Sequence, residues 1–204
     1  MRDDAIIIGG TFNPITNAHL QMGIKLKEEY PLADVIYIPS NLKFISSWKN
    51  IEDSDVFCDK NRIALLKSVL NFFGFKMSLV EVDEEVDGST YDTVMHFKKA
   101  YKNVSVAIGI DKLQELSKWK NVKELLDIAN FFVFNRGPEF TESLIPNCLL
   151  DYKTKLKAIK IDGVDNVSST VIRTSFKKGN LDEIKNLVPE EVYNFLKKER
   201  QRYV

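Results

Sequence analysis

Short runs of apolar and β-branched residues alternate along this chain with longer segments that carry apolar residues at helical spacing. The short runs are residues 5–8, 35–38, 78–82, 104–109, 131–134 and 157–161. The longer segments are residues 18–29, 60–73, 91–101 and 113–129. Runs such as AIII are apolar at every position, which is typical of strands covered on both faces. The alternation predicts an α/β fold: a Rossmann-like, doubly wound, mostly parallel sheet with helices on both faces.

The pattern changes after the last predicted strand. The segment SSTVIRTSFKKG, residues 168–179, predicts a helix that ends at Gly179. The segment LVPEEVYNFLKKER, residues 187–200, predicts a second helix with Pro189 near its start. The length of 204 residues suits a single domain over residues 1–204, with residues 165–204 as a C-terminal helical extension packed on it.

Charges are balanced in this chain, with 29 residues of each sign. A general nucleic-acid binder would carry a basic excess, so we expect no nucleic-acid partner. No apolar run reaches the ~18 residues that a membrane helix needs, and the first residues lack the pattern of a secretory signal. We therefore expect a cytoplasmic protein with no membrane partner. Cys58 and Cys148 belong to no Cys/His cluster, so we expect reduced thiols and no metal held by protein side chains.

The stretch GGTFNPITNAH, residues 9–19, follows the first apolar run. The first strand is expected to end at Gly9, and a helix is expected to begin near Thr16, whose hydroxyl suits an N-cap. The unpaired backbone N–H groups at a helix start attract anions, and glycines let the backbone approach phosphate oxygens. His19 would add a donor in the first helical turn. The alternative is that Gly9 and Gly10 only form a turn and that His19 lies on the surface.

A second candidate phosphate site follows the last predicted strand. SSTVIR, residues 168–173, places Ser168, Ser169 and Thr170 at a helix start and Arg173 about one turn later. Two such sites in one chain suit a polyphosphate ligand.

Three motifs in this order carry a family resemblance. GGTFNPITNAH resembles the TxxH form of the signature of the HxGH nucleotidyltransferase superfamily, and SSTVIR resembles its ISSTxIR motif. Between them, AIGIDKLQELSKWKNVKELLDIANFFVFNRG resembles the GAD, KW and ANxxVxxR block of nicotinate or nicotinamide mononucleotide adenylyltransferases. The resemblance implies an enzyme of NAD biosynthesis that joins ATP and a pyridine mononucleotide and releases pyrophosphate, with Mg²⁺ accompanying ATP.

The acceptor is the open part of this interpretation. The length and the central block are similar to the bacterial type, which favours nicotinate mononucleotide and a deamido-NAD product. PITNAH, with Thr16 and Ala18 in place of histidine and glycine, is closer to the nicotinamide type. Phosphopantetheine could be the acceptor instead, or the chain could be a nucleotide-binding regulator without catalysis. Assembly into a homo-oligomer also stays open.

The resemblance implies roles for individual residues. His19, Thr16 and Arg173 would contact phosphates, with Arg173 on the leaving β and γ groups. The chain around the two nucleotides would comprise Gly9, Gly10, Thr11, Phe12, Ser168, Ser169, Thr170 and Asp111, the last near a ribose.

On the pyridine side, Trp119 would stack on the ring, and Thr93 and Arg136 would contact the mononucleotide. The basic residue expected after the second strand is Lys43 or Lys49, and Lys43 is favoured because it lies closer to the strand end. Each has a plainer interpretation: Trp119 as core, Asp111 as the cap of a helix beginning at Lys112, Arg136 and Lys43 as solvated charges. His96 is expected to be structural.

Overall fold

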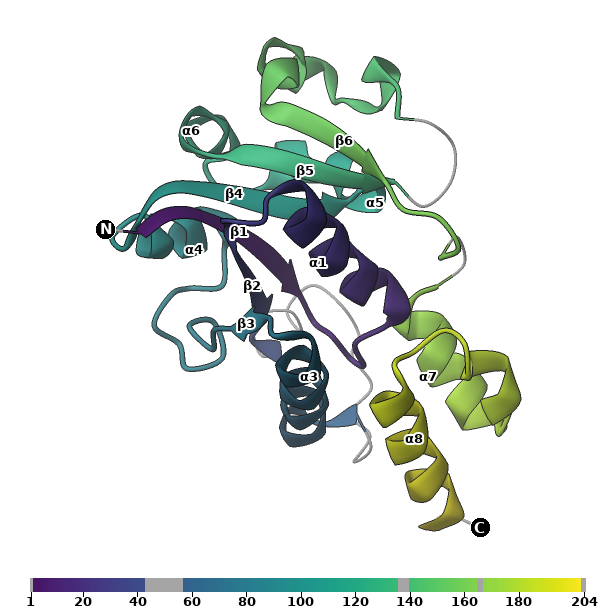
Figure 1. Cartoon of the computed structure of the whole chain (residues 1–204). Helices are drawn as coiled ribbons and strands as arrows, with labels where there is room; N and C mark the ends of the chain where they lie inside the picture. The colour runs from purple at the N-terminus through teal and green to yellow at the C-terminus, as the bar shows by residue number, and fades with distance from the viewer. Residues whose placement is uncertain (1, 43–56, 136–139, 165–166, 203–204) are drawn as a thin grey trace.

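The computed structural model describes residues 2–42, 57–135, 140–164 and 167–202. At its centre is a six-stranded sheet with the strand order β3-β2-β1-β4-β5-β6, and every neighbouring pair is parallel (Figure 1). The strands are β1 (Arg2–Gly10), β2 (Asp34–Pro39), β3 (Lys76–Met77), β4 (Tyr101–Gly109), β5 (Asn130–Asn135) and β6 (Leu156–Lys160). The predicted Rossmann-like α/β class is confirmed.

The apolar run at residues 5–8 forms the buried part of the central strand β1. Ile6 and Ile8 belong to one buried cluster, and Ala5 and Ile7 belong to the other. Alternate residues of a strand point to opposite faces, so a strand buried on both sides needs apolar residues throughout.

Helices cover both faces of this sheet (Figure 1). One cluster contains buried residues of α1 (Asn17–Glu29), α3 (Asp59–Phe73), α7 (Ser169–Lys178) and α8 (Glu190–Arg202). The other contains residues of α4 (Thr90–Phe97), α5 (Ile110–Leu113) and α6 (Val122–Ile128). Short 3₁₀ segments complete the described elements: η2 (Leu116–Lys118), η3 (Glu142–Leu144), η4 (Asn147–Lys155) and η5 (Leu181–Ile184).

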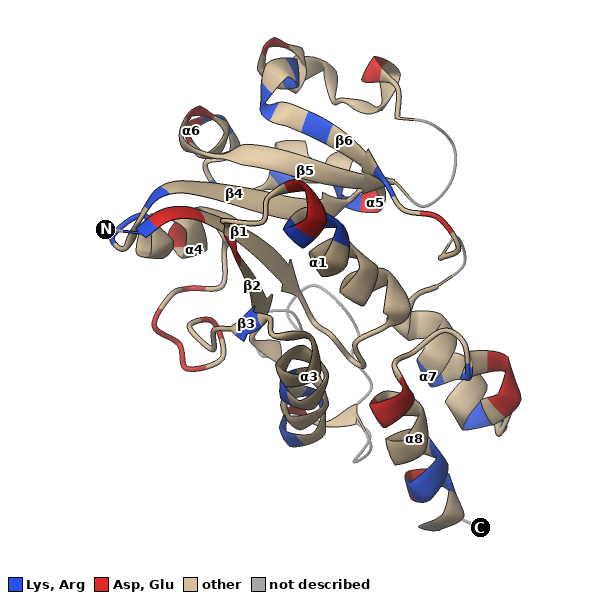
Figure 2. Cartoon of the chain, in the orientation of Figure 1, with Lys and Arg blue, Asp and Glu red and all other residues tan. Residues whose placement is uncertain are grey.

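The third strand differs from its prediction at residues 78–82. Strand β3 covers only Lys76–Met77, at the sheet edge, and the chain then turns, with the Asp83 amide bonded to the Leu79 carbonyl. Val80 is buried because this turn packs against a core cluster, which gives it a strand-like sequence without pairing. The acidic residues of the β3–α4 connection are visible in Figure 2.

Two helix predictions also need correction. The segment 113–129 is broken, because Trp119 is extended and Asn121 adopts a left-handed backbone with φ 49°. Leu113, Leu116, Leu125 and Leu126 are all buried, so the apolar spacing persists across the break. The segment 91–101 ends as a helix at Phe97, and Tyr101 already begins β4.

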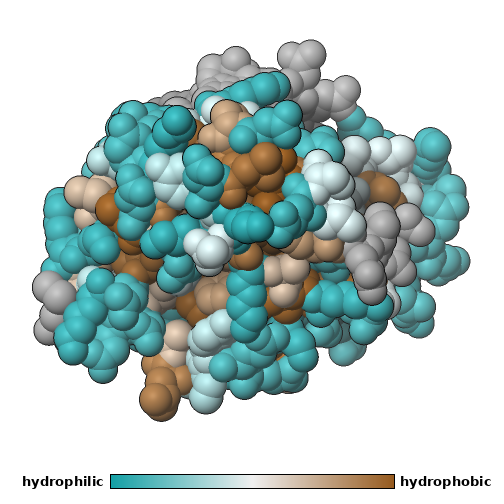
Figure 3. All heavy atoms as spheres, turned by 90° about the horizontal axis from the view of Figure 1, so that it is seen from above, coloured by the Kyte–Doolittle hydropathy of each residue, from teal (hydrophilic) through white to brown (hydrophobic). Residues whose placement is uncertain are grey.

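The C-terminal helices share the core of the sheet. Helix α7 ends at Gly179, whose φ of 83° is left-handed, and this confirms the predicted C-cap. Ile172, Phe176, Val192 and Leu196 are buried in the same cluster as Ile8. Hydrophilic residues make up most of the face seen in Figure 3, with hydrophobic patches between them. Across the described residues, no helix is long and apolar enough to cross a membrane.

Candidate active site

A cavity of about 460 Å³ opens at the carboxyl ends of β1, β2 and β4. Strands β1 and β4 are the neighbours at which the strand order reverses, and open α/β sheets bind ligands at such a point. One side of the lining comes from the end of β1 and the start of α1, including Gly9, Gly10, Thr11 and His19. The other comes from the region of α4 and from the segment after β4, including Thr93, Asp111 and Trp119. Residues from motifs that are far apart in the sequence therefore line one cavity.

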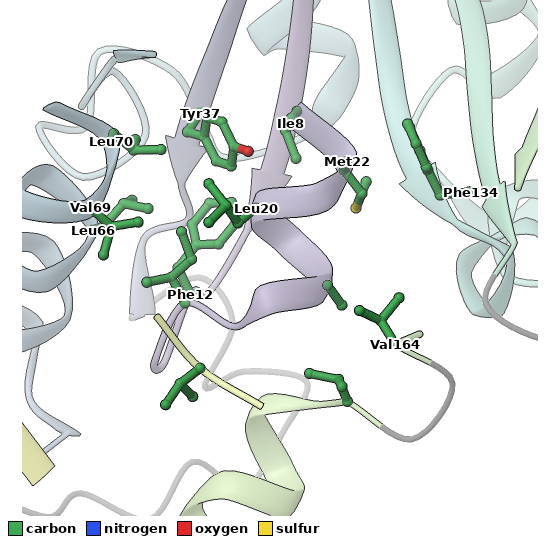
Figure 4. Packing of buried hydrophobic residues seen from close by; sticks show 14 of the residues in the cluster. Ile8, Phe12, Leu20, Met22, Tyr37, Leu66, Val69, Leu70, Phe134 and Val164 are labelled. Atoms are coloured by element: carbon green, nitrogen blue, oxygen red, sulfur yellow. The ribbon is translucent and has the colours of Figure 1, made fainter. Parts of the chain in front are cut away.

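The loop after β1 is held in place by Phe12. This residue has a left-handed backbone, with φ 45°, and its ring is 1% exposed. The ring lies edge-on to that of His19, at 5.2 Å between centroids. The centroid of the Tyr37 ring is 5.7 Å away, and Phe12 and Tyr37 both belong to the cluster in Figure 4. A Cβ on Gly10 would lie 3.2 Å from the Phe12 ring, whereas one on Gly9 would meet nothing within 4 Å. The absence of a side chain at Gly10 therefore leaves room for the Phe12 ring, and this buried ring fixes the conformation of the loop after β1.

His19 is oriented by Thr16. The Thr16 backbone N–H donates to Nδ1 of His19 at 3.2 Å, and the Thr16 hydroxyl lies 2.9 Å from the same nitrogen. Because Nδ1 accepts a hydrogen bond, the neutral imidazole carries its proton on Nε2. Thr16 is fully buried. Its side chain contacts His19 inside the protein, while His19 itself lines the cavity.

The start of α1 is partly occupied by the C-terminal part of the chain. The Asn17 backbone N–H, which is the first of the helix, donates to the Leu187 carbonyl at 2.9 Å, and its side chain donates to the Asn186 carbonyl. This amide is therefore unavailable to a phosphate, a constraint that sequence reasoning did not foresee. Ala18 and His19 line the cavity at this end of the helix.

The SSTVIR segment docks on the loop after β1. Arg173 donates to the Asn13 carbonyl at 2.7 Å, and the Ser169 hydroxyl donates to the Pro14 carbonyl at 2.8 Å. Ser168 caps α7 by accepting from the Val171 amide, and Thr170 Oγ1 lies 3.3 Å from Arg173. Within the described part of the chain, six predicted site residues are absent from the cavity lining: Thr16, Phe12, Ser168, Ser169, Thr170 and Arg173. Arg173 is half-buried, and burial lowers the pKa of its guanidinium, which nevertheless stays charged.

The opposite wall carries the ring-binding candidates. Trp119 is half-buried, with its ring 6.3 Å from that of Phe131, so part of it stays available to the cavity. Asp111 is exposed at the cavity edge. The proposed helix cap at Asp111 is wrong, because α5 begins at Ile110 and its N-cap is Gly109. Lys43 and Arg136 lie outside the described residues.

Arg62 is a residue of this site that sequence reasoning missed. It is 1% exposed and donates to the Thr11 carbonyl at 2.9 Å, the Ser40 carbonyl at 2.6 Å and Asp59. It therefore joins the loop after β1 to the loop after β2. The sequence does carry a signal for its burial, namely helical spacing. Arg62 lies four residues before Leu66 and eight before Leu70, on the buried stripe of α3. Burial lowers the pKa of Arg62, and the carboxylate of Asp59 opposes that effect.

Two carboxylates beside the cavity differ in their protonation. Glu81 is 6% exposed, and burial raises the pKa of its carboxyl to about 7, although a hydrogen bond from Thr93 acts in the other direction. Partial burial would also raise the pKa of Asp87, but hydrogen bonds from Lys120 and from the Ser89 amide hold it below its usual range. Lys120 lies 2.6 Å from both Asp87 and Asp92.

Residues 7–175 match the family model described as cytidylyltransferase-like. The chain is 32% identical over 200 residues to a probable nicotinate-nucleotide adenylyltransferase of Clostridium acetobutylicum, covering 95% of this chain and 96% of the relative. It is 35% identical over 190 residues to a protein of the same description from Clostridium novyi, covering 91% and 92%.

A solved structure shares the fold. It is the Plasmodium falciparum nicotinic acid mononucleotide adenylyltransferase complexed with APC, with a TM-score of 0.72 and 18% identity over 97% of this chain and 96% of that one. The same protein complexed with NaAD matches equally well. At this level of identity the match describes the fold.

Proposed function

The chain belongs to the cytidylyltransferase-like family, and from this premise we propose that it is a nicotinate-nucleotide adenylyltransferase. It would join ATP and nicotinate mononucleotide into deamido-NAD and release pyrophosphate. The observation that carries the proposal is one shared cavity: His19 and the glycine loop line one side, and Trp119 and Asp111 line the other. This arrangement offers a hydrogen-bond donor to the phosphates of one nucleotide and an aromatic ring on which the other can stack.

The reaction needs positioning more than a protein nucleophile. A phosphate oxygen of the mononucleotide attacks the α-phosphorus of ATP, and the bond between that phosphorus and the bridging oxygen of the β-phosphate breaks, so that pyrophosphate leaves. Such transfers depend on in-line alignment and on stabilising the charge that develops on the phosphoryl oxygens. The protein groups of interest are therefore donors.

We assign that role to His19. With Nδ1 accepting from Thr16, Nε2 carries the proton of the neutral imidazole, and in our proposal this N–H donates to the α-phosphate of bound ATP. A donor of fixed orientation stabilises a developing negative charge without reorganising during the reaction. Thr16 then acts through His19, by fixing the tautomer and the ring orientation.

Arg173 is proposed to neutralise the leaving pyrophosphate from the far side of the loop. Its bond to the Asn13 carbonyl uses part of the guanidinium, which carries five N–H donors in total. Ser168, Ser169 and Thr170 support this arginine by fixing the start of α7 against the loop.

Mg²⁺ fits this site as part of the ATP substrate. Within the described ranges no group of three or more His, Cys, Asp and Glu residues could hold a metal ion, and Mg²⁺ commonly binds through substrate phosphates and water. When bound to ATP, it offsets phosphate charge. On the pyridine side, Trp119 would stack on the ring, with Asp111 near a ribose and Thr93 close to the mononucleotide. Lys43 and Arg136 remain predicted contacts.

The test is pyrophosphate release from MgATP with nicotinate mononucleotide and, in parallel, with nicotinamide mononucleotide and phosphopantetheine. Turnover with nicotinate mononucleotide at the highest kcat/KM supports the proposal. Faster turnover with another acceptor would reassign the substrate. ATP binding without turnover in any tube would instead indicate a nucleotide-binding regulator.

A further inference from the structure

Glu81 is a buried acid in the wall of the nucleotide cavity. It lies in the turn after β3, is 6% exposed and lines the cavity. Its Oε1 accepts from the Thr93 hydroxyl at 2.9 Å, and Ser40 is a further hydrogen-bond partner. The side chain is thus fixed between the loop after β2 and helix α4, and it is bonded to Thr93, the cavity residue that the proposed function places close to the mononucleotide.

The charged groups around Glu81 act on its pKa in opposite directions. Arg62 approaches it from α3, but that guanidinium is already bonded to Asp59 and to the carbonyls of Thr11 and Ser40. Asp87, which precedes α4, acts against ionisation of Glu81. Burial is the largest influence, and it places the pKa of Glu81 at about 7.

Other charged or titratable groups also line the cavity: His19, Asp87, Asp111, Lys112, Glu115 and Lys120. Asp87 stays ionised near neutral pH because Lys120 holds it so. Of these groups, His19 faces the phosphates in the proposed function, where both pyridine mononucleotides are alike.

The two pyridine mononucleotides share a ribose and a phosphate and differ in one ring substituent, an anionic carboxylate or a neutral amide. We propose that Glu81 is a specificity-determining residue whose protonation sets the preference between them. A neutral Glu81 tolerates the nicotinate anion, and an ionised Glu81 disfavours it while leaving the amide unaffected. The inference rests on the proposed function and adds to it a pH-dependent choice of substrate.

The sign and the size follow from electrostatics. Like charges repel, and at an effective dielectric constant of ~20 one unit charge several ångströms from another changes an affinity by about tenfold or more. With a pKa of about 7, Glu81 is mostly neutral below pH ~6 and mostly ionised above pH ~8. The preference for the acid is therefore greatest at low pH and is lost as the pH rises through neutrality.

The experiment measures the ratio of kcat/KM for nicotinate mononucleotide to that for nicotinamide mononucleotide at saturating MgATP, from pH 6 to pH 8.5. Proton changes on ATP and on the 5′-phosphate that the two mononucleotides share affect both substrates alike and cancel in the ratio. Where the amide turns over too slowly, its inhibition constant replaces its kcat/KM. We expect the ratio to fall about fivefold or more across this range.

Two variants identify the responsible group. Glu81→Gln keeps an acceptor for Thr93 but cannot ionise, so its ratio should be independent of pH and should stay near the low-pH value. Glu85→Gln removes an acid from the same turn that is exposed and outside the cavity lining, and it should keep the wild-type pH dependence.

Turnover with a ratio that stays within twofold over the whole pH range in the unaltered protein would overturn the inference and leave the proposed function standing. The same holds if the slope persists in Glu81→Gln. Absence of turnover with both mononucleotides at every pH would remove the proposed function and this inference together.

Discussion

His19 owes its orientation to two contacts with Thr16, the N-cap residue of α1. Thr16 supplies both a backbone N–H and a hydroxyl to Nδ1, so the ring presents Nε2 as a donor. At the scale of the single residue, the proposed chemistry depends on this tautomer and on the charge it can stabilise in the transition state.

Replacing His19 by Ala should lower kcat by about 10² or more, because a donor to the transition state is lost. The measurement is steady-state pyrophosphate release at saturating substrates. His96→Ala is the matched control, because His96 lies on α4 outside the cavity lining. A fall of less than threefold for His19→Ala would rule out the assigned role.

Trp119→Ala should raise KM for the mononucleotide about tenfold while KM for ATP stays nearly constant, because stacking of a base on an aromatic ring contributes ~1–3 kcal/mol. Titrations of each substrate at saturation of the other measure this. Phe72→Ala removes an aromatic ring that is 76% exposed on α3 and should change neither constant. Equal weakening of both substrates would contradict ring stacking.

At the scale of elements, helix α3 connects the ends of β1 and β2 through Arg62, a charged residue on the buried face of the helix. Arg62 is shielded from solvent and binds the carbonyls that follow β1 and β2. Removing one partner of a buried network leaves the other groups without hydrogen bonds in a place where that is costly.

Arg62→Met should therefore reduce the free energy of unfolding by about 3 kcal/mol, because two carbonyls and Asp59 lose their donor. It should also raise KM for both substrates, since both loops line the cavity. Urea unfolding gives the first quantity and initial rates give the second. Lys67→Met, an exposed change on the same helix, should shift unfolding by less than ~0.5 kcal/mol. A stability of Arg62→Met equal to that control would refute the joining role.

Element by element, sequence reasoning succeeded where one local signal sufficed. The apolar run of β1 and the glycine that ends α7 both specify their structure locally. It failed at β3, because Val80 is buried by a turn and periodicity does not distinguish the two kinds of burial. It also failed at Asn121, where the backbone breaks while the buried leucines continue.

The candidate site likewise contains features that local motifs predict and features that only the folded structure reveals. The motifs singled out His19, Trp119 and the glycines, and the structure brings these residues together around one cavity, while their roles stay predictions. They could not reveal that Leu187 occupies the Asn17 amide, nor that Arg62 and Glu81 are buried there, because these contacts join residues distant in sequence. Such contacts depend on tertiary packing, which local patterns do not encode.

At the scale of the whole molecule, Glu81 links stability to pH. Its pKa is about 7 in the folded protein and near 4.5 when exposed, so between these values the folded state holds a proton that the unfolded state has released. The resulting stabilisation is complete below pH ~4.5 and is lost as the pH rises through ~7.

The free energy of unfolding of the unaltered protein, compared with Glu81→Gln, should therefore fall by roughly 3 kcal/mol between pH 4.5 and pH 7.5. Parallel urea titrations at these two pH values measure the difference, and Glu85→Gln serves again as the control. A difference that does not change with pH would show that Glu81 titrates alike in both states.

Two hydrogen bonds, from the Asn17 N–H to the Leu187 carbonyl and from Arg173 to the Asn13 carbonyl, also bear on how the protein is synthesised. During translation the loop after β1 leaves the ribosome well before its guanidinium partner, which follows Asn13 by 160 residues. Until that later segment has been synthesised, the nascent loop lacks the contacts that hold it in the folded protein.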